Sequence, residues 1–225
     1  MKILITGGAG YIGSHLTLEL IKRHELFLLD NFSNSDIGNI KSIEKLSKKS
    51  FFFKEVDLKE KNSLRFIFES FRPSLVIHLA SLKSVNESLL YPLRYYENNV
   101  VGTINLLETM GKFNCKNIIF SSSASVYGHV NKKDAINENF NTKPLCVYSK
   151  TKLLMETIIQ DWIKINVDTK GIILRYFNPV GAHKSGLIGD KYKIKPQSLI
   201  QNICHVAKKR SKYLKIYGNN YSDRK

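Results

Sequence analysis

Short apolar runs alternate along the chain with longer stretches in which apolar residues recur at helical spacing. This alternation predicts an α/β protein with a doubly wound parallel sheet, covered by helices on both faces. The expected strands span residues 2–6, 26–30, 51–56, 75–79, 117–121 and 171–175. The expected helices span residues 11–23, 37–46, 61–71, 93–110, 147–165 and 197–209.

The alternation fails in two places. Residues 128–144 are polar and follow neither a helical nor a strand period, so we expect a surface loop over the active-site edge of the sheet. After Pro179 the pattern breaks down again. We therefore expect residues 1–178 to form one domain and residues 179–225 to begin a smaller, incomplete C-terminal substrate lobe.

Composition places the chain among soluble globular proteins. Its 225 residues are 43% hydrophobic, enough for one sizeable core. No apolar run approaches the roughly 20 residues of a membrane span. The first apolar run is too short for a signal peptide, and the three cysteines are odd in number and widely separated. We expect a cytoplasmic protein with reduced thiols and no membrane association.

The net charge of +16 raises the possibility of nucleic-acid binding. The lysines are scattered, however, and the densest basic run is only Lys208-Lys209-Arg210, so a solvated surface is the favoured interpretation. The six histidines do not fall at metal-ligand spacing, and the chain has no Cys-x-x-Cys. We expect neither nucleic acid nor metal as a partner.

Three glycines follow the first expected strand at a spacing of three residues. Gly7, Gly10 and Gly13 would permit a tight turn, close approach of the backbone to a pyrophosphate, and close helix packing. The helix that follows would present amide donors to the phosphates. Asp30 closes the second strand and would accept hydrogen bonds from the adenosine ribose while repelling a 2′-phosphate. The pattern indicates a Rossmann-type NAD-binding domain, although a simple glycine-rich turn is the alternative.

Tyr148 and Lys152 stand four residues apart in an expected helix and therefore share one face. A lysine ammonium beside a phenol favours the phenolate, so tyrosine could act as a base near neutral pH. A serine run, Ser121-Ser122-Ser123, lies at the carboxyl end of the fifth strand, where ligands bind in such sheets. Its hydroxyls could relay a substrate proton to Tyr148, although such a run is also common in ordinary turns.

Taken together, these residues resemble the UDP-glucose 4-epimerases (UDP-galactose 4-epimerases) of the extended short-chain dehydrogenase/reductase superfamily. The glycine block is general to the superfamily, whereas the lysine-containing block and the block after the sixth strand are more specific to the epimerases. The matching blocks are Thr6-Gly7-Gly8-Ala9-Gly10-Tyr11-Ile12-Gly13, Val76-Ile77-His78-Leu79-Ala80-Ser81-Leu82-Lys83, Tyr95-Tyr96-Glu97-Asn98-Asn99-Val100, and Leu174-Arg175-Tyr176-Phe177-Asn178-Pro179-Val180-Gly181-Ala182-His183.

The resemblance implies a set of site residues. Tyr148 would be the base, Lys152 its activator and ribose anchor, and Ser123 the hydroxyl that aligns the sugar. The implied NAD contacts are Gly7, Gly10, Tyr11, Ile12, Gly13, Asp30, Asn31, Asp57, Leu58, Ala80, Lys83, Asn98, Ser123, Tyr148, Lys152 and Phe177. The implied substrate contacts are Lys83, Ser123, Tyr148, Asn178, Ser198 and Tyr217.

Two of these substrate contacts depart from the family pattern or have another explanation. Ser198 stands where relatives often carry asparagine, so its contact with the nucleotide is in question. Tyr217 could stack on uracil, but a buried edge aromatic would look the same in sequence.

The resemblance also implies a reaction and an assembly. UDP-glucose and UDP-galactose would interconvert at C4 through a 4-keto sugar: Tyr148 takes the hydroxyl proton and NAD takes the hydride. The resembled family forms homodimers through the helices at 93–110 and 147–165, and we expect the same here.

The chain departs from the family after Tyr221, where relatives continue with an arginine that grips the diphosphate. We therefore expect a C-terminally truncated form. Two functions remain open: an epimerase, or an impaired NAD-binding domain without turnover. A 4,6-dehydratase is less favoured, because that family places a Thr-Asp-Glu-type acid pair where this chain has Ser122-Ser123-Ala124.

Overall fold

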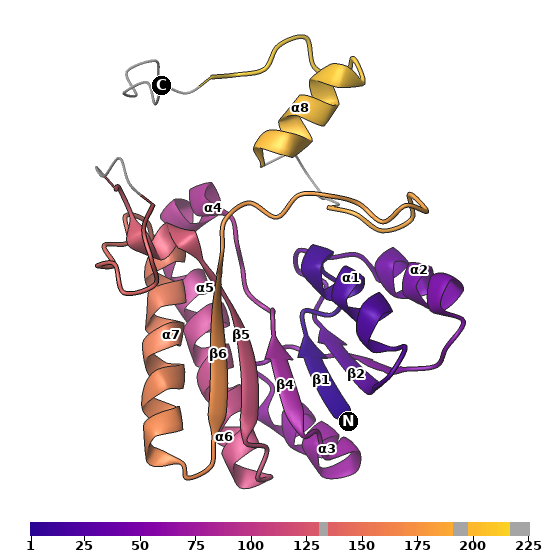
Figure 1. The fold of residues 1–225 in the computed structure, drawn as a ribbon, viewed down its shortest axis with the longest axis vertical. Helices are drawn as coiled ribbons and strands as arrows, with labels where there is room; N and C mark the ends of the chain where they lie inside the picture. The colour runs from indigo at the N-terminus through magenta and orange to yellow at the C-terminus, as the bar shows by residue number, and fades with distance from the viewer. Residues whose placement is uncertain (131–134, 191–197, 217–225) are drawn as a thin grey trace.

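The computed structural model describes residues 1–130, 135–190 and 198–216. Six parallel strands form one sheet in the order β3-β2-β1-β4-β5-β6 (Figure 1). This arrangement confirms the expected doubly wound sheet. The strands are β1 (Lys2–Thr6), β2 (Glu25–Asp30), β3 (Phe52–Glu55), β4 (Leu75–His78), β5 (Asn117–Ser123) and β6 (Lys170–Tyr176).

Helices cover the two faces unequally. Side chains alternate between the faces of a strand, so Ile3 and Ile5 pack with α1 (Tyr11–Leu20) and α2 (Ile37–Ser47). Leu4 points to the opposite face, whose core is completed by the remaining long helices. These are α3 (Lys61–Phe71), α6 (Gly102–Lys112) and α7 (Val147–Ile165).

The expected single helix over residues 93–110 was wrong. The structure has α5 (Pro92–Tyr95), a π-helix η1 (Tyr96–Val101) and then α6, preceded by a short helix α4 (Val85–Leu90) that the sequence pattern did not predict. Asn99 in the π-helix is buried and bonds outside its own helix, to the backbone of Leu82. Such bonding accounts for a wider turn at this point, and π-turns of this kind are frequent at functional sites.

The carboxyl ends of all six strands meet at one edge of the sheet, and the predicted site residues follow these ends. Strand β5 extends to Ser123, two residues further than expected, because Ser122 and Ser123 pair with Arg175 and Tyr176 of β6. A 3₁₀ turn, η2 (Ala124–Tyr127), follows. The chain after β6 passes across this edge towards α1, and α8 (Leu199–Ala207) stands apart from the sheet (Figure 1).

Candidate functional site

The glycine turn is built as a cradle at the end of β1. Gly7 has φ of 73°, and a Cβ there would lie 2.8 Å from the Ala80 nitrogen, so only glycine fits. At Gly13 a Cβ would lie 2.3 Å from the Gly7 oxygen, which is why α1 can pack so close to the turn. Helix α1 begins after Gly10, and no described side chain caps it. Its first amides are therefore open to an anion such as a pyrophosphate.

Asp30 ties the end of β2 to the glycine turn. Its Oδ2 accepts a hydrogen bond from the Ala9 amide at 3.0 Å, and its Oδ1 accepts from the Ser35 hydroxyl at 2.6 Å. The carboxylate is buried. Next to it, the Asn31 side chain donates to Asp57 at 3.0 Å, which joins the ends of β2 and β3. Five predicted cofactor contacts, Gly7, Gly10, Asp30, Asn31 and Asp57, thus line one stretch of the sheet edge.

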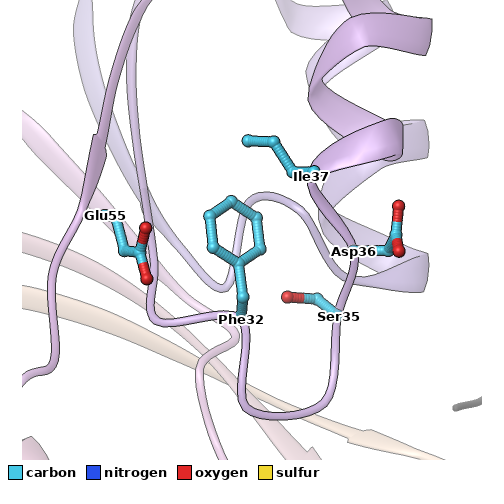
Figure 2. Close-up of a pocket in the computed structure, with 5 residues that line it drawn as sticks. All are labelled: Phe32, Ser35, Asp36, Ile37 and Glu55. Atoms are coloured by element: carbon cyan, nitrogen blue, oxygen red, sulfur yellow. The ribbon is translucent and has the colours of Figure 1, made fainter.

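A hollow of about 370 Å³ lies beside this stretch, between the β2–α2 turn and the end of β3 (Figure 2). It is lined by Phe32, Ser35, Asp36, Ile37 and Glu55. None of the predicted site residues lines this hollow, although Ser35 touches Asp30.

The end of β4 carries a buried polar chain. The Thr103 hydroxyl donates to the Asn99 carbonyl at 2.6 Å and must therefore accept from His78 Nε2 at 3.0 Å. His78 Nδ1 is then the acceptor for the Thr6 hydroxyl at 2.8 Å. Burial, with a smaller contribution from the charge of Lys152, lowers the pKa of His78 to about 3. A neutral imidazole thus connects β1, β4 and α6 in the interior.

Asn99 connects the loop after β4 to the helix that carries the tyrosine and lysine. Its side chain bonds both backbone groups of Leu82, at 2.8 and 3.1 Å, and donates to Thr151 of α7 at 3.0 Å. The preceding residue, Asn98, donates to the Asn99 side chain. Lys83, next to Leu82, is exposed and pairs with Asp190 at 3.5 Å. The π-helix therefore fixes the loop that presents Lys83.

Helix α7 places Tyr148 and Lys152 on one face, at the end of β5. Cys146 caps the helix by accepting from the Ser149 amide. Lys152 is buried, and its Nζ donates to the Ser121 carbonyl at 2.8 Å and lies 5.0 Å from the centre of the Phe120 ring. Ser123, at the end of β5, accepts a hydrogen bond from Ser125. The structure brings Tyr148, Lys152 and Ser123 together.

Burial controls the protonation of this pair. It raises the pKa of the Tyr148 phenol above its ordinary value, and hydrogen bonding to Ser123 works in the opposite direction. Burial also lowers the pKa of Lys152 to about 7, against the opposing effect of Glu156. The chain by itself therefore holds Tyr148 as a neutral phenol, and a positive charge brought by a ligand would be needed to favour the phenolate.

A buried ion pair between Glu156 and Arg175, which the sequence did not predict, lies beside Tyr148 and Lys152. Glu156 accepts from Arg175 Nη2 at 2.7 Å and from Nε at 3.0 Å, and it accepts a short hydrogen bond from Ser122. Arg175 Nη1 also donates to the Tyr127 hydroxyl and to the Glu138 carbonyl, both at 2.9 Å. The four-residue spacing from Lys152 to Glu156 could have drawn attention to Glu156, but not to Arg175, which lies on another element.

The predicted substrate contacts are less well assembled. Asn178 is exposed just after β6, as is Phe177, a predicted cofactor contact. Ser198 caps α8 by accepting from the Gln201 amide at 3.3 Å. Tyr217 lies outside the described residues. Two bonds hold the intervening segment against the cofactor side: the Tyr11 hydroxyl donates to the Gly181 carbonyl at 2.7 Å, and Lys83 pairs with Asp190.

Membrane-spanning helices and metal-binding clusters are both absent from the described residues. Among the described residues, no helix has the length and apolarity needed to cross a membrane. In the same residues, no group of three or more His, Cys, Asp and Glu side chains is arranged to hold a metal ion. Cys115, Cys146 and Cys204 are free thiols.

Known proteins have sequences similar to this one along almost the whole chain. Residues 3–224 match the family described as the NAD dependent epimerase/dehydratase family. The UDP-glucose 4-epimerase of Erwinia amylovora is 45% identical, with 98% of this chain and 66% of the relative covered. The UDP-glucose 4-epimerase uge1 of Schizosaccharomyces pombe is 42% identical, with 97% and 63% covered. The chain thus spans slightly less than two-thirds of the length of these relatives.

Solved structures agree with the sequences. The UDP-glucose 4-epimerase of Bifidobacterium longum, crystallised with NAD⁺ and UDP, superposes with a TM-score of 0.93 at 36% identity, with 99% of this chain and 67% of that chain covered. The enzyme of Stenotrophomonas maltophila, with NAD and formylated UDP-arabinopyranose, gives 0.95 at 35% identity, with 99% and 66% covered. The glycine cradle, the tyrosine and lysine of α7 and these matches lead to one conclusion: the chain belongs to the NAD dependent epimerase/dehydratase family.

Proposed function

We propose that this chain binds NAD and epimerises a UDP-hexose at C4, interconverting UDP-glucose and UDP-galactose. The observation that carries the proposal is the meeting of Tyr148, Lys152 and Ser123 at the end of β5, on the same sheet edge as the glycine cradle. The named relatives and solved structures, which are UDP-glucose 4-epimerases, support it.

The residues present fit a dinucleotide. The backbone of Gly7 leaves room that a side chain would fill, and the uncapped start of α1 offers amides to the pyrophosphate. Asp30, Asn31 and Asp57 would hold the adenosine end, and Lys83, Asn98 and Lys152 the nicotinamide riboside. When bound, NAD supplies a hydride acceptor that later returns the hydride to the same carbon.

The chain's own residues handle the proton. Tyr148 would take the proton of the sugar 4-hydroxyl and return it after the 4-keto sugar has turned its other face to the cofactor. Ser123 would hold that oxygen, and the Lys152 ammonium, held by the Ser121 carbonyl, would stabilise the phenolate. Because burial keeps the pKa of Tyr148 high in the free chain, the base would form only when the positively charged nicotinamide ring of the cofactor is in place.

A coupled assay tests the proposal. UDP-galactose is incubated with the chain and NAD, and the UDP-glucose formed is oxidised by a UDP-glucose dehydrogenase. We expect NADH production that depends on the chain. No production above that of a Tyr148→Phe variant would contradict the proposal.

We also propose a preference for NAD over NADP. The Asp30 carboxylate is buried at the place where the adenosine ribose would lie, and a 2′-phosphate would bring like charge against it. Calorimetry with the two cofactors measures the preference directly. We expect NAD to bind at least tenfold more tightly, a difference of about 1.4 kcal/mol, and equal affinities would refute the role assigned to Asp30.

A second function has a specific observation in its favour. Helix α8, all of whose residues are described, has none buried, so the substrate half of the site has little support of its own in this chain. This favours the alternative of an impaired NAD-binding domain without turnover. For either function, we propose that residues 1–178 form the cofactor domain and that residues 179–225 begin a separate substrate lobe.

A homodimer completes the proposal. Large apolar side chains are exposed along the helices expected to form the interface, including Leu93 at 80% and Leu154 at 42%. A hollow lined by Ile104, Ile158 and Trp162 lies between α6 and α7 and could take a side chain of a second copy. A stable monomer in light scattering would contradict the proposed homodimer.

We also propose that the protein is cytoplasmic, because its cysteines are free thiols.

A further inference from the structure

The face of α7 that carries Tyr148 and Lys152 has a third member, one turn further along. Glu156 follows Lys152 at the same four-residue spacing and is 2% exposed. Lys152 is similarly buried, at 3%. Two ionisable side chains one turn apart in the interior require compensation for their lost hydration, and the neighbouring strands supply it.

Three successive serines of β5 meet the three members of this face. Hydrogen bonding links Ser123 to Tyr148, the Ser121 carbonyl accepts from Lys152, and the Ser122 hydroxyl bonds the Glu156 carboxylate. The end of β5 is therefore fastened to α7 residue by residue. Glu156 is the member of this set that carries a negative charge.

The charges around Lys152 come from several elements. On its own helix lie Tyr148 and Glu156, and below it lies His78 of β4, which is neutral. Arg175 of β6 faces Glu156 and bonds it through both Nε and Nη2. Glu156 thus stands between two cations, Arg175 and Lys152.

We propose that Glu156 is a positioning residue for the reaction: it holds the serine run of β5 against α7 and, through its charge, keeps Lys152 an ammonium in the interior. Arg175 weakens the effect of Glu156 on Lys152, because it bonds the same Glu156 carboxylate. The inference rests on the proposed function for its meaning, since an ammonium at Lys152 is what would stabilise the phenolate of Tyr148. Glu156 itself does not touch the reacting atoms.

The titration of Lys152 tests the inference without turnover. Protein carrying ¹³C-labelled lysine is titrated by NMR, and the Lys152 signal is identified by its loss in Lys152→Met. In Glu156→Gln the midpoint is expected to fall by about one pH unit, a tenfold change in the ratio of ammonium to amine. In Arg175→Gln it is expected to rise, because the carboxylate then acts on Lys152 alone.

The opposite signs separate charge from packing. A merely structural role would move the midpoint in the same direction in both variants, or not at all, and either result would overturn the proposal. Ser122→Ala is the matched control, since it removes one hydrogen bond from Glu156 and keeps the charge, so the midpoint should stay near that of the unmodified chain.

The Lys152 titration remains a test even if Glu156→Gln fails to fold. If Glu156→Gln does not fold, the double variant Glu156→Gln, Arg175→Gln removes both charges together, which buried pairs tolerate better. Its midpoint should lie below that of Arg175→Gln alone, and a midpoint equal to it would overturn the proposal. Because neither NAD nor substrate is present, absence of epimerase activity would leave this result unaffected.

Discussion

The described residues up to the end of β6, at Tyr176, form a first region. It is built differently from a second region, the described residues 177–190 and 198–216. In the first region, apolar side chains close two cores, and Lys152, Glu156 and His78 are buried with their hydrogen bonds made. In the second, α8 buries no residue, and Leu199 and Ile203 are 64% and 42% exposed. The first region stabilises its own site, whereas the second provides apolar surface without a core of its own.

The difference indicates how the work is divided along the chain. In the proposed function, cofactor binding and proton transfer would depend on groups that the first region fixes by itself. Substrate selection would depend on the second region, which is attached through Ile188, buried in the core with Ile3 and Leu18, and through the bonds of Tyr11 and Lys83. Both of those side chains are proposed cofactor contacts, so the substrate segment is held by the cofactor half of the site.

The largest expected effect comes from the first region. Tyr148→Phe removes the proton acceptor and should lower kcat by about 10⁴-fold, the upper range for a general base. NAD binding should persist, because the cradle and Asp30 are unchanged. Activity and calorimetry on the same protein make the comparison, and retained turnover would refute the role of Tyr148.

The second region is tested by extension. Joining the remaining part of a relative such as the Erwinia amylovora enzyme to this chain should raise kcat/KM by about a thousandfold, since several charge-assisted contacts to phosphate are each worth about 1.5–3 kcal/mol. The affinity for NAD should change little. Equal kcat/KM in the two proteins would mean that the first region is sufficient.

A matched pair of substitutions compares the packing directly. Ile159→Ala removes a fully buried side chain of α7 and should lower the free energy of unfolding by about 2–5 kcal/mol. Ile203→Ala makes the same change on α8, where the side chain is 42% exposed, and should cost less than about 0.5 kcal/mol. Urea unfolding measures both. Similar losses would show that α8 packs on a core after all.

A more gradual effect is a pH dependence confined to the first region. Burial lowers the pKa of Lys152 to about 7, below its ordinary 10.5, and that of His78 to about 3, below 6.5. Between each pair of values the unfolded chain binds a proton that the folded chain does not. The free energy of unfolding should therefore fall as the pH falls from 10.5 to 7 and again from 6.5 to 3.

Two variants test which residue titrates in each of these two pH ranges. Lys152→Met should stabilise the fold at pH 7 and remove most of the dependence between pH 7 and 10, because no buried ammonium remains. His78→Gln keeps a donor and an acceptor for Thr103 and Thr6 and should remove part of the acid window. An unchanged slope in Lys152→Met, measured by urea unfolding, would show that Lys152 is not the group that titrates.

The sequence predicted the parts of the site that depend on local spacing. The glycine turn and the four-residue interval between Tyr148 and Lys152 follow from steps along one element, and the doubly wound parallel sheet follows from the alternation of strand and helix. The π-helix at Tyr96–Val101 could not be predicted, because it depends on bonds from Asn99 to Leu82 and Thr151, which are distant in sequence. The Glu156–Arg175 ion pair could not be predicted for the same reason, because its two partners belong to different elements.

One measurement tests the central claim, that this chain epimerises a UDP-hexose by removing and returning the hydrogen at C4. UDP-glucose carrying deuterium at C4 is incubated overnight with the 225-residue chain and NAD, and the products are separated and analysed by mass spectrometry. Even a thousandfold loss of rate would leave product to detect over this time. We predict UDP-galactose that retains the deuterium, formed by the chain and not by Tyr148→Phe. No product above that control, or deuterium lost to water, would contradict the account.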